Sequence, residues 1–109
     1  GGQIISGCER GIAHMAMIVG LCTVELHFPD SLSLKSKRKI LVSLKTRLQN
    51  RFNVSIAEIE EMVLWQKAIL GIAVVANETA RVNQTLDHVL NDIRANPSLE
   101  LVRSQIEIL

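Results

Sequence analysis

Aromatic residues are scarce in this sequence, and tyrosine is absent. Phe28, Phe52 and Trp65 make up the whole aromatic content, 3% of the 109 residues. Proteins that read single-stranded RNA on a sheet surface stack the bases on several aromatic side chains. The sequence therefore excludes a base-reading protein of the RNA-recognition-motif type.

Motifs that carry catalytic or metal chemistry are also missing. The chain has two cysteines and three histidines, but no Cys/His pairing, no glycine-rich phosphate loop and no Ser/His/Asp order. His88 lies near Asp87 and Asp92, which we interpret as a solvated acidic helix face and not as a metal site. We therefore expect no enzymatic activity, no metal and no cofactor.

Residues 1–14 differ in character from the rest of the chain. They show no periodicity, and they lead into Ala-His-Met, the pattern that a common cloning site leaves before a start codon. We interpret them as a flexible expression remnant, with a native extension as the alternative. Cys8 falls in this segment, so we expect Cys22 to be a small buried hydrophobe in a cytoplasmic protein without a disulfide.

Residues 15–109 are expected to form a single domain. A hydrophobic content of 48% is sufficient for a folded core, and no apolar run approaches the ~20 residues that span a membrane. Apolar residues alternate in some segments and recur at helical spacing in others. The expected elements are strands at 17–28, 53–61, 67–77 and 99–109 and helices at 34–51 and 78–95. Ser33 and Asn77 are the expected N-caps of the two helices.

This order of elements predicts a ferredoxin-like βαββαβ fold. It is an α+β sandwich in which two helices cover one face of a four-stranded antiparallel sheet. Right-handed crossovers place the first and third strands at the centre, in agreement with their apolar composition. The uncovered face is expected to carry Val19, Leu21, Thr23, Glu25, Leu101, Arg103 and Gln105. Because that face is too apolar for a fully wet surface, we expect a homodimer that pairs the sheet faces or their edges, with a monomer as the alternative.

Acidic residues are absent from residues 31–52, which hold seven of the chain's twelve Lys and Arg residues. The remainder of the chain carries five basic and eleven acidic residues. A net charge of +1 therefore conceals a segment at +7 and a remainder at −6. Such an asymmetry indicates a surface for an anionic partner.

The basic residues crowd the start of the helix at 34–51. A helix N-terminus carries about half a positive charge, so each cation there is disfavoured by about 0.3–1 kcal/mol, whereas a phosphate is favoured. We hypothesise that Ser33, Lys35, Lys37 and Arg38 bind phosphate, and that the phosphate belongs to a nucleic-acid backbone. The alternative is a solvated basic face that acidic residues balance across space, Glu58, Glu60 and Glu61 among them.

The complete candidate surface follows the whole helix. Candidate residues for binding an anion or RNA are Ser33, Lys35, Lys37, Arg38, Lys39, Lys45, Arg47 and Arg51, with His27, Trp65 and Lys67 as possible accessory residues. The expected buried stripe of the helix is Leu34, Leu41, Leu44 and Leu48. Lys37 falls at the same helical angle as this stripe, so we expect its stem to lie on apolar groups and its head to emerge at the edge of the sheet.

Several short stretches resemble one known family. They are Gly20-Leu21-Cys22-Thr23-Val24-Glu25-Leu26-His27, Ser33-Leu34-Lys35 with Lys37-Arg38, Arg51-Phe52-Asn53-Val54-Ser55, Leu64-Trp65-Gln66, Leu70-Gly71 and Ile106-Glu107-Ile108-Leu109. Together they resemble the bacterial YlxP-like proteins over residues 17–109. The resemblance implies a ferredoxin-like domain of unknown function. It also implies an association with RNA or the ribosome, since in some bacteria the gene neighbours those for transcription termination, translation initiation and ribosome maturation. It supplies no catalytic residues.

Two functional hypotheses follow. The first is a small cytoplasmic, non-enzymatic protein that binds structured RNA or a ribosomal subunit through the basic helix, in ribosome maturation or translation. The second is a dimeric interaction module, or a regulatory module that holds a small anion at that helix. A third, enzymatic interpretation requires a carboxylate such as Glu25 or Glu58 close to Lys37.

Overall fold

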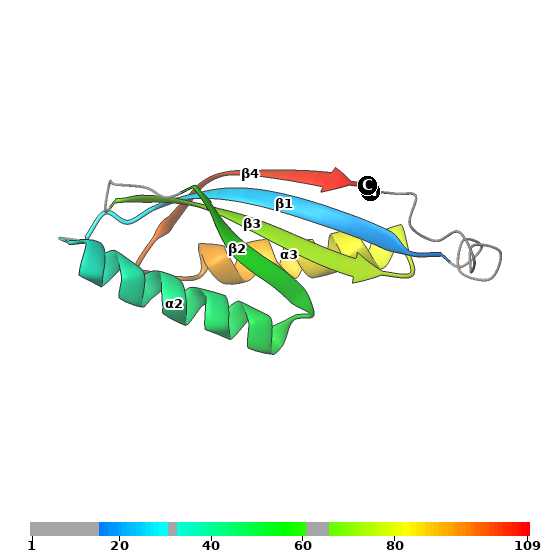
Figure 1. Cartoon of the computed structure of the whole chain (residues 1–109), viewed down its shortest axis with the longest axis horizontal. Coiled ribbons are helices and arrows are strands. Elements are labelled where there is room, and N and C mark those ends of the chain that lie inside the picture. Colours follow the sequence, from blue (N-terminus) through cyan, green and yellow to red (C-terminus); the bar gives the residue numbers. More distant parts are fainter. Residues whose placement is uncertain (1–15, 31–32, 61–65) are drawn as a thin grey trace.

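The computed structural model describes residues 16–30, 33–60 and 66–109, and within them four strands and two helices alternate as the sequence predicts (Figure 1). The elements are β1 (Ile18–His27), α2 (Leu34–Arg51), β2 (Val54–Glu60), β3 (Lys67–Ala76), α3 (Thr79–Arg94) and β4 (Glu100–Ile108). Every expected boundary lies within one residue of the observed one. No helix in this part of the chain is long and apolar enough to cross a membrane.

All neighbouring strands of the sheet are antiparallel, in the order β2-β3-β1-β4. The two most apolar strands, β1 and β3, lie at the centre and pair along their whole lengths, from Ile18 opposite Ala76 to His27 opposite Lys67. Both helices lie on one side of the sheet, and no helix of the described residues lies on the other side (Figure 1). The ferredoxin-like α+β fold is therefore confirmed.

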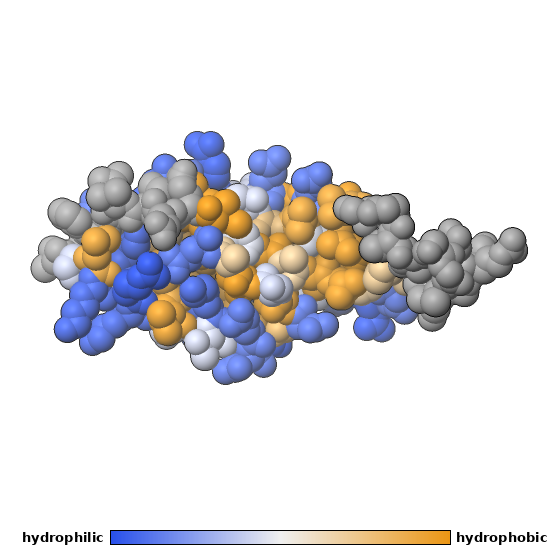
Figure 2. Space-filling view, viewed as in Figure 1, coloured by the Kyte–Doolittle hydropathy of each residue, from blue (hydrophilic) through white to orange (hydrophobic). Residues whose placement is uncertain are grey.

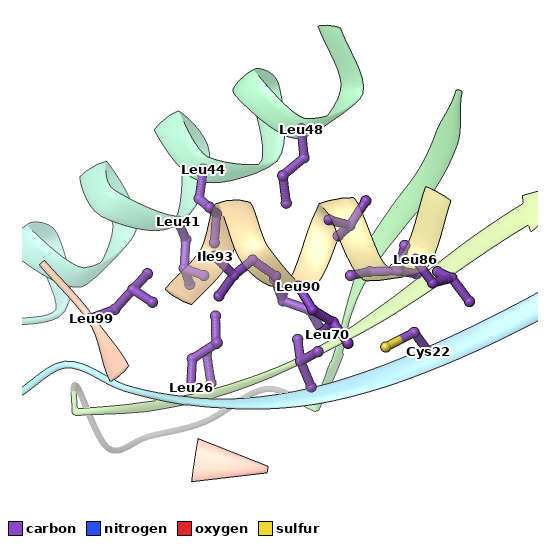
Figure 3. Packing of buried hydrophobic residues seen from close by; sticks show 14 of the residues in the cluster. Cys22, Leu26, Leu41, Leu44, Leu48, Leu70, Leu86, Leu90, Ile93 and Leu99 are labelled. Carbon is purple, nitrogen blue, oxygen red and sulfur yellow. The ribbon is translucent and has the colours of Figure 1, made fainter. Parts of the chain in front are cut away.

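The hydrophobic core fills the space between the sheet and the two helices. Leu41, Leu44 and Leu48 of α2 point toward the sheet, with Leu90 and Ile93 of α3 beside them (Figure 3). All five side chains are buried. Cys22, on the same face of β1, is also buried, and burial raises the pKa of its thiol, which keeps it an inert hydrophobe as expected.

Two details of the helices differ from the prediction. Leu34, expected in the buried stripe, is 48% exposed, because Lys37 takes the inward position at the start of α2. Asn77, expected to cap the second helix, does not do so. Helix α3 begins at Thr79, so the N-cap position falls on Glu78, whose side chain makes no capping hydrogen bond.

A β-bulge changes which residues of β4 face the open side of the sheet. Glu25 pairs with Arg103, but the next residue, Leu26, pairs with Leu101, so Val102 is an extra residue on β4. Leu101 was expected on the open face. It instead packs against the core, because the extra residue shifts its register onto the buried Leu26.

The open face carries both apolar and polar residues, and the apolar ones gather at its centre. At its centre lies a shallow hollow of about 290 Å³. Among the residues that line it are Leu21, Ala57, Ile59, Gly71 and Ala73. Charged groups gather at one end of this face, where the Glu25 carboxylate lies 3.6 Å from the Lys67 ammonium and 3.5 Å from the Arg103 guanidinium.

Two strand glycines allow close approach on opposite faces of the sheet. A Cβ atom at Gly20 would lie 2.3 Å from Cγ1 of Val82, a fully buried residue of α3. A Cβ atom at Gly71 would lie 2.4 Å from Cδ1 of Ile59, whose side chain covers Gly71 on the open face and is 60% exposed. A Cβ atom at position 20 would clash with a side chain that is packed in the core. A Cβ atom at position 71 would clash with the end of a side chain that is able to move into solvent.

We therefore predict that G20A is the more destabilising of two matched substitutions. In G20A helix α3 must move, which costs about 1–3 kcal/mol of unfolding free energy. In G71A the Ile59 side chain changes rotamer, and the free energy changes by less than about 1 kcal/mol. Urea unfolding of both variants measures the difference, and equal losses would contradict the close packing of α3 on β1.

Candidate functional site

The start of α2 combines a capped backbone with a cationic surface. Ser33 is the N-cap, and its Oγ accepts a hydrogen bond of 3.1 Å from the backbone N–H of Ser36. The first turn contains no acidic residue, so nothing on the helix itself offsets the positive end of its dipole. Lys35 extends into solvent from this turn. The predicted N-cap role of Ser33 is therefore confirmed, and its contact with phosphate stays a prediction.

Lys37 points into the protein. It is 4% exposed, and its Nζ donates a hydrogen bond of 3.0 Å to the backbone carbonyl of Lys67, the first residue of β3. Burial lowers the pKa of Lys37, and the negative charge of Glu58 acts in the opposite direction. The expectation that its head emerges at the edge of the sheet was wrong: the helix angle was correct, but the ammonium group finds an acceptor inside. Lys37 ties α2 to β3.

Glu58 of β2 holds two cations of α2. Its Oε2 lies 2.8 Å from Nη1 of Arg38 and 3.1 Å from Nζ of Lys45. Partial burial raises the pKa of Glu58, but the hydrogen bonds and charges of Lys45 and Arg38 outweigh that effect, so the net pKa is lower than usual. Part of the predicted charge balance is thus confirmed, since Glu58 does face the basic helix. The side chain of Glu60 and the whole of Glu61 lie outside the described structure.

Asp92 of α3 holds two more cations at the other end of the helix. Its carboxylate lies 3.3 Å from Nε of Arg47 and 2.6 Å from Nη1 of Arg51, and its side chain is only 5% exposed. Arg51 also stacks over the Phe52 ring, with 5.6 Å between Cζ and the ring centroid. The interpretation of Asp92 as part of a solvated acidic face was wrong, because residues of α2 cover it.

The remaining cations of α2 are open. Lys35 and Lys39 are exposed and have no ion-pair partner in residues 16–30, 33–60 and 66–109. Figure 2 shows hydrophilic residues over the part of the surface that α2 occupies in Figure 1. The arginine side chains in the two clusters are also 54–59% exposed. The guanidinium groups therefore keep donors for a ligand while the carboxylates hold them in place.

The charge of this surface follows from these contacts. Apart from buried Lys37, α2 carries six cations, and four of them lie within ion-pair distance of two carboxylates in the described part of the chain, which leaves an excess of four positive charges. We call this surface, formed by Lys35, Arg38, Lys39, Lys45, Arg47 and Arg51, the cationic face. It extends along the helix and does not converge on one point.

The accessory residues lie apart from the cationic face or outside the described structure. His27 Nδ1 lies 2.8 Å from Oε1 of Glu100 on the neighbouring strand. The Lys67 ammonium faces Glu25 on the open side of the sheet, although its carbonyl accepts the Lys37 hydrogen bond. Trp65 falls in residues 61–65, which the structure does not describe.

Two further observations bear on what the surface can hold. The described residues contain no group of three or more His, Cys, Asp and Glu side chains arranged to hold a metal ion. A hollow of about 360 Å³ lies between the end of α2 and α3. Arg47, Arg51, His88 and Asp92 are among the residues that line it. The Asp92 carboxylate in this hollow opposes a bound anion.

Fold and surface together define a ferredoxin-like α+β protein with a cationic first helix. The chain belongs to the family described as "Protein of unknown function (DUF503)", which matches residues 19–106. It is 37% identical over 90 residues to the "Uncharacterized protein YlxP" of Bacillus subtilis (strain 168), a match that covers 83% of this chain and 98% of that protein. The family membership that the sequence motifs indicated is confirmed, and it brings no assigned activity.

Solved structures are similar in fold alone. A hydantoinase/carbamoylase family amidase from Burkholderia ambifaria aligns with a TM-score of 0.56 and 7% identity, over 87% of this chain and 28% of the amidase. The de novo designed protein Foldit4 aligns with a TM-score of 0.45 and 10% identity, over 85% of this chain and 93% of the design. At such identities the likeness says nothing about the function of this chain.

Lys37 and Lys35 lie two residues apart on one helix but have different roles in the structure. We predict that K37A lowers the unfolding free energy by about 1–3 kcal/mol, because it leaves the Lys67 carbonyl without this donor and removes the packed stem. K35A, the matched exposed control, changes it by less than about 0.5 kcal/mol. Chemical denaturation measures both values. Equal stability of the two variants would contradict the inward position of Lys37.

Glu58 makes stability depend on pH in the acid range. Its pKa is lower in the folded than in the unfolded chain, so the unfolded state binds more protons between the two values. The stabilisation is complete above the usual glutamate value of 4.5 and is lost as the pH falls through the folded pKa. We predict that E58Q costs about 1 kcal/mol at pH 7 and almost nothing at low pH.

Urea unfolding at pH 7 and in the acid range tests this prediction. D87N is the control, because it removes an exposed carboxylate of α3 that has no ion-pair partner among the described residues. If E58Q and the parent lose stability in parallel as the pH falls, the two cations do not stabilise the Glu58 carboxylate.

Proposed function

We propose that the protein is a non-enzymatic RNA-binding protein whose cationic face contacts the phosphate backbone of structured RNA, free or within a ribosomal subunit. The observation that carries the proposal is the excess of four positive charges on the outer surface of α2, although acidic residues are nearly as numerous as basic ones in the whole chain. Phosphate is the most abundant ligand for such a surface, and its contacts supply affinity without reading sequence.

The arrangement of the cations supports a backbone ligand over a single bound phosphate. Helix α2 has 18 residues, and at about 1.5 Å per residue it is about 27 Å long, comparable to several phosphates along an RNA strand. Its cations extend from Lys35 in the first turn to Arg51 in the last. Because Ser33 caps the helix and Lys37 points inward, the helix start offers no cluster of the four residues first expected there.

The ion pairs within the cationic face are compatible with this role. Each of the two carboxylates meets two cations, so each cluster keeps one positive charge. The arginine side chains are 54–59% exposed, so their remaining N–H donors are able to contact a phosphate while the carboxylates keep their ion pairs. The carboxylates also restrict the arginine rotamers, which reduces the entropy lost on binding.

The mode of recognition that we propose is shape and charge. The strands of the described sheet contain no Phe, Tyr or Trp, so base reading by several stacked aromatic side chains on the open face has no support. A-form RNA presents regularly spaced phosphates that a rigid cationic helix is able to follow. The alternative of a small bound anion is less favoured, because the hollow beside Arg47 and Arg51 contains the Asp92 carboxylate.

A salt-dependent RNA titration tests the proposal. For an excess of four charges, the affinity for a short RNA duplex should fall roughly 100-fold between about 50 and 200 mM salt. We predict that K35Q/K39Q weakens binding about tenfold or more at low salt and lowers the salt slope by about 1 per lysine, because each lysine neutralises one phosphate. Fluorescence anisotropy with a labelled duplex measures both quantities.

The matched control removes the same charge from the other helix. R81Q/R94Q changes two exposed arginines of α3 and should leave both the affinity and the salt slope almost unchanged. Equal losses in the two double variants would show that only net charge matters, and an absence of binding by the parent at low salt would contradict the proposal.

A further inference from the structure

Strand β4 forms an open edge of the sheet. Among the described strands it has a hydrogen-bonded neighbour only on the side of β1, and it runs along the outer side of β1 in Figure 1. It is nine residues long and contains no proline. A long edge strand of this kind presents a row of unpaired backbone N–H and C=O groups, which another strand is able to extend.

One backbone hydrogen bond shows which backbone groups of β4 face outward. The N–H of Leu109 donates to the carbonyl of Val19 over 2.8 Å, so the backbone of Leu109 faces β1. Because these directions alternate along a strand, the backbone groups of Arg103, Gln105 and Glu107 also face β1. Those of Ser104, Ile106 and Ile108 face away from the sheet. Any strand that adds to this edge must bond to these three residues.

We propose that β4 pairs in antiparallel fashion with β4 of a second copy of the chain, centred on Gln105, so that two sheets join into one continuous eight-stranded sheet. In this register Ser104 lies opposite Ile106 of the second copy, and both have outward backbone groups, as a hydrogen-bonded pair requires. A two-fold axis through Gln105 repeats the pairing on the other side. The interface is then isologous, and it closes after two copies.

Charge complementarity selects this register. On the open side of the sheet, Arg103 precedes Gln105 and Glu107 follows it, so the strand carries a positive, a neutral and a negative position in turn. A two-fold axis at Gln105 places Arg103 opposite Glu107 of the second copy, twice per dimer. These are non-hydrogen-bonded pairs, in which side chains approach most closely.

Other registers lose this match. A two-fold axis at Arg103 or Glu107 would place like charges opposite each other. An axis at Ser104 or Ile106 would leave both charges opposite uncharged residues. Arg103 is available for the pair, since its side chain is 78% exposed and its contact to Glu25 uses Nε at 3.5 Å. The two terminal nitrogens of the guanidinium are the groups that we assign to the second copy.

Apolar contacts on the helix side of the sheet agree with the same register. Val102, Ile106 and Ile108 of β4 are 52%, 38% and 37% exposed. The pairing places Val102 opposite Ile108 of the second copy. It also brings Ile106 of each copy near the two-fold axis. The opposite edge of the sheet, β2, lacks this charge pattern, because its charged residues are two glutamates.

Sedimentation velocity of the full chain tests the pairing, which does not depend on RNA binding. The parent should be a dimer at about 100 µM. S104P removes an outward N–H and keeps the ladder to β1, since proline is tolerated on the free side of an edge strand. We expect S104P to be monomeric and S104A, its matched control, to remain dimeric, both with the circular dichroism spectrum of the parent.

Charge exchange tests the register. E107R places a positive charge opposite Arg103 of the second copy. This repulsion should raise the dimer dissociation constant at least about tenfold. R103E/E107R restores opposite charges across the axis and should recover most of the loss. A parent that is monomeric at about 100 µM overturns the proposal. A dimer that S104P and E107R leave intact also overturns it, and indicates that the copies pair through the open face of the sheet. A double exchange that fails to recover dimerisation contradicts the register.

Discussion

Two carboxylates outside α2 make it possible for that helix to carry its cations. Glu58 from β2 and Asp92 from α3 each contact two basic side chains, and buried Lys37 fastens the start of the helix to β3. Without them, seven like charges along 18 residues would repel one another beside the positive end of the helix dipole. The contacts stabilise the helix but remain fewer than the charges, so the folded protein keeps a positive surface.

The fold places the cationic face, the apolar hollow and the free edge of β4 on different parts of the molecule. The cationic face lies on the helix side of the sandwich, the apolar hollow lies on the open face, and β4 lies at the edge of the sheet (Figure 1). Pairing through β4 therefore does not cover α2. A dimer of the kind proposed would present two cationic faces to one large anionic partner, and two linked contacts bind more tightly than either alone.

Most of the fold could be predicted from hydrophobic periodicity. The bounds of α2 were predicted correctly because Ser33 marks its start, and because the apolar stripe stops shortly before the extended segment that begins at Val54. Leu101 was assigned to the wrong face because the bulge at Val102 depends on strand pairing and leaves no pattern in the sequence. Lys37 was predicted only in part. Its helical angle predicted an inward direction, but no local pattern reveals that the Lys67 carbonyl accepts a hydrogen bond from its ammonium group.

The candidate site could be predicted as a charged helix but not as a set of contacts. Asp92 is 41 residues from Arg51 along the chain, and only the packing of α3 against α2 brings them together. Glu58 was one of several acidic residues that could have faced the basic helix, and β2 selects it by placing it on the helix side of the sheet.

Sedimentation of a cell extract through sucrose gradients at low and high salt tests the central claim most directly. If the cationic face binds structured RNA, the protein migrates with ribosomal particles or other RNA at low salt, and high salt or ribonuclease returns it to the top of the gradient. A protein that remains at the top under both conditions would contradict the account, and the charge on α2 would then serve the fold alone.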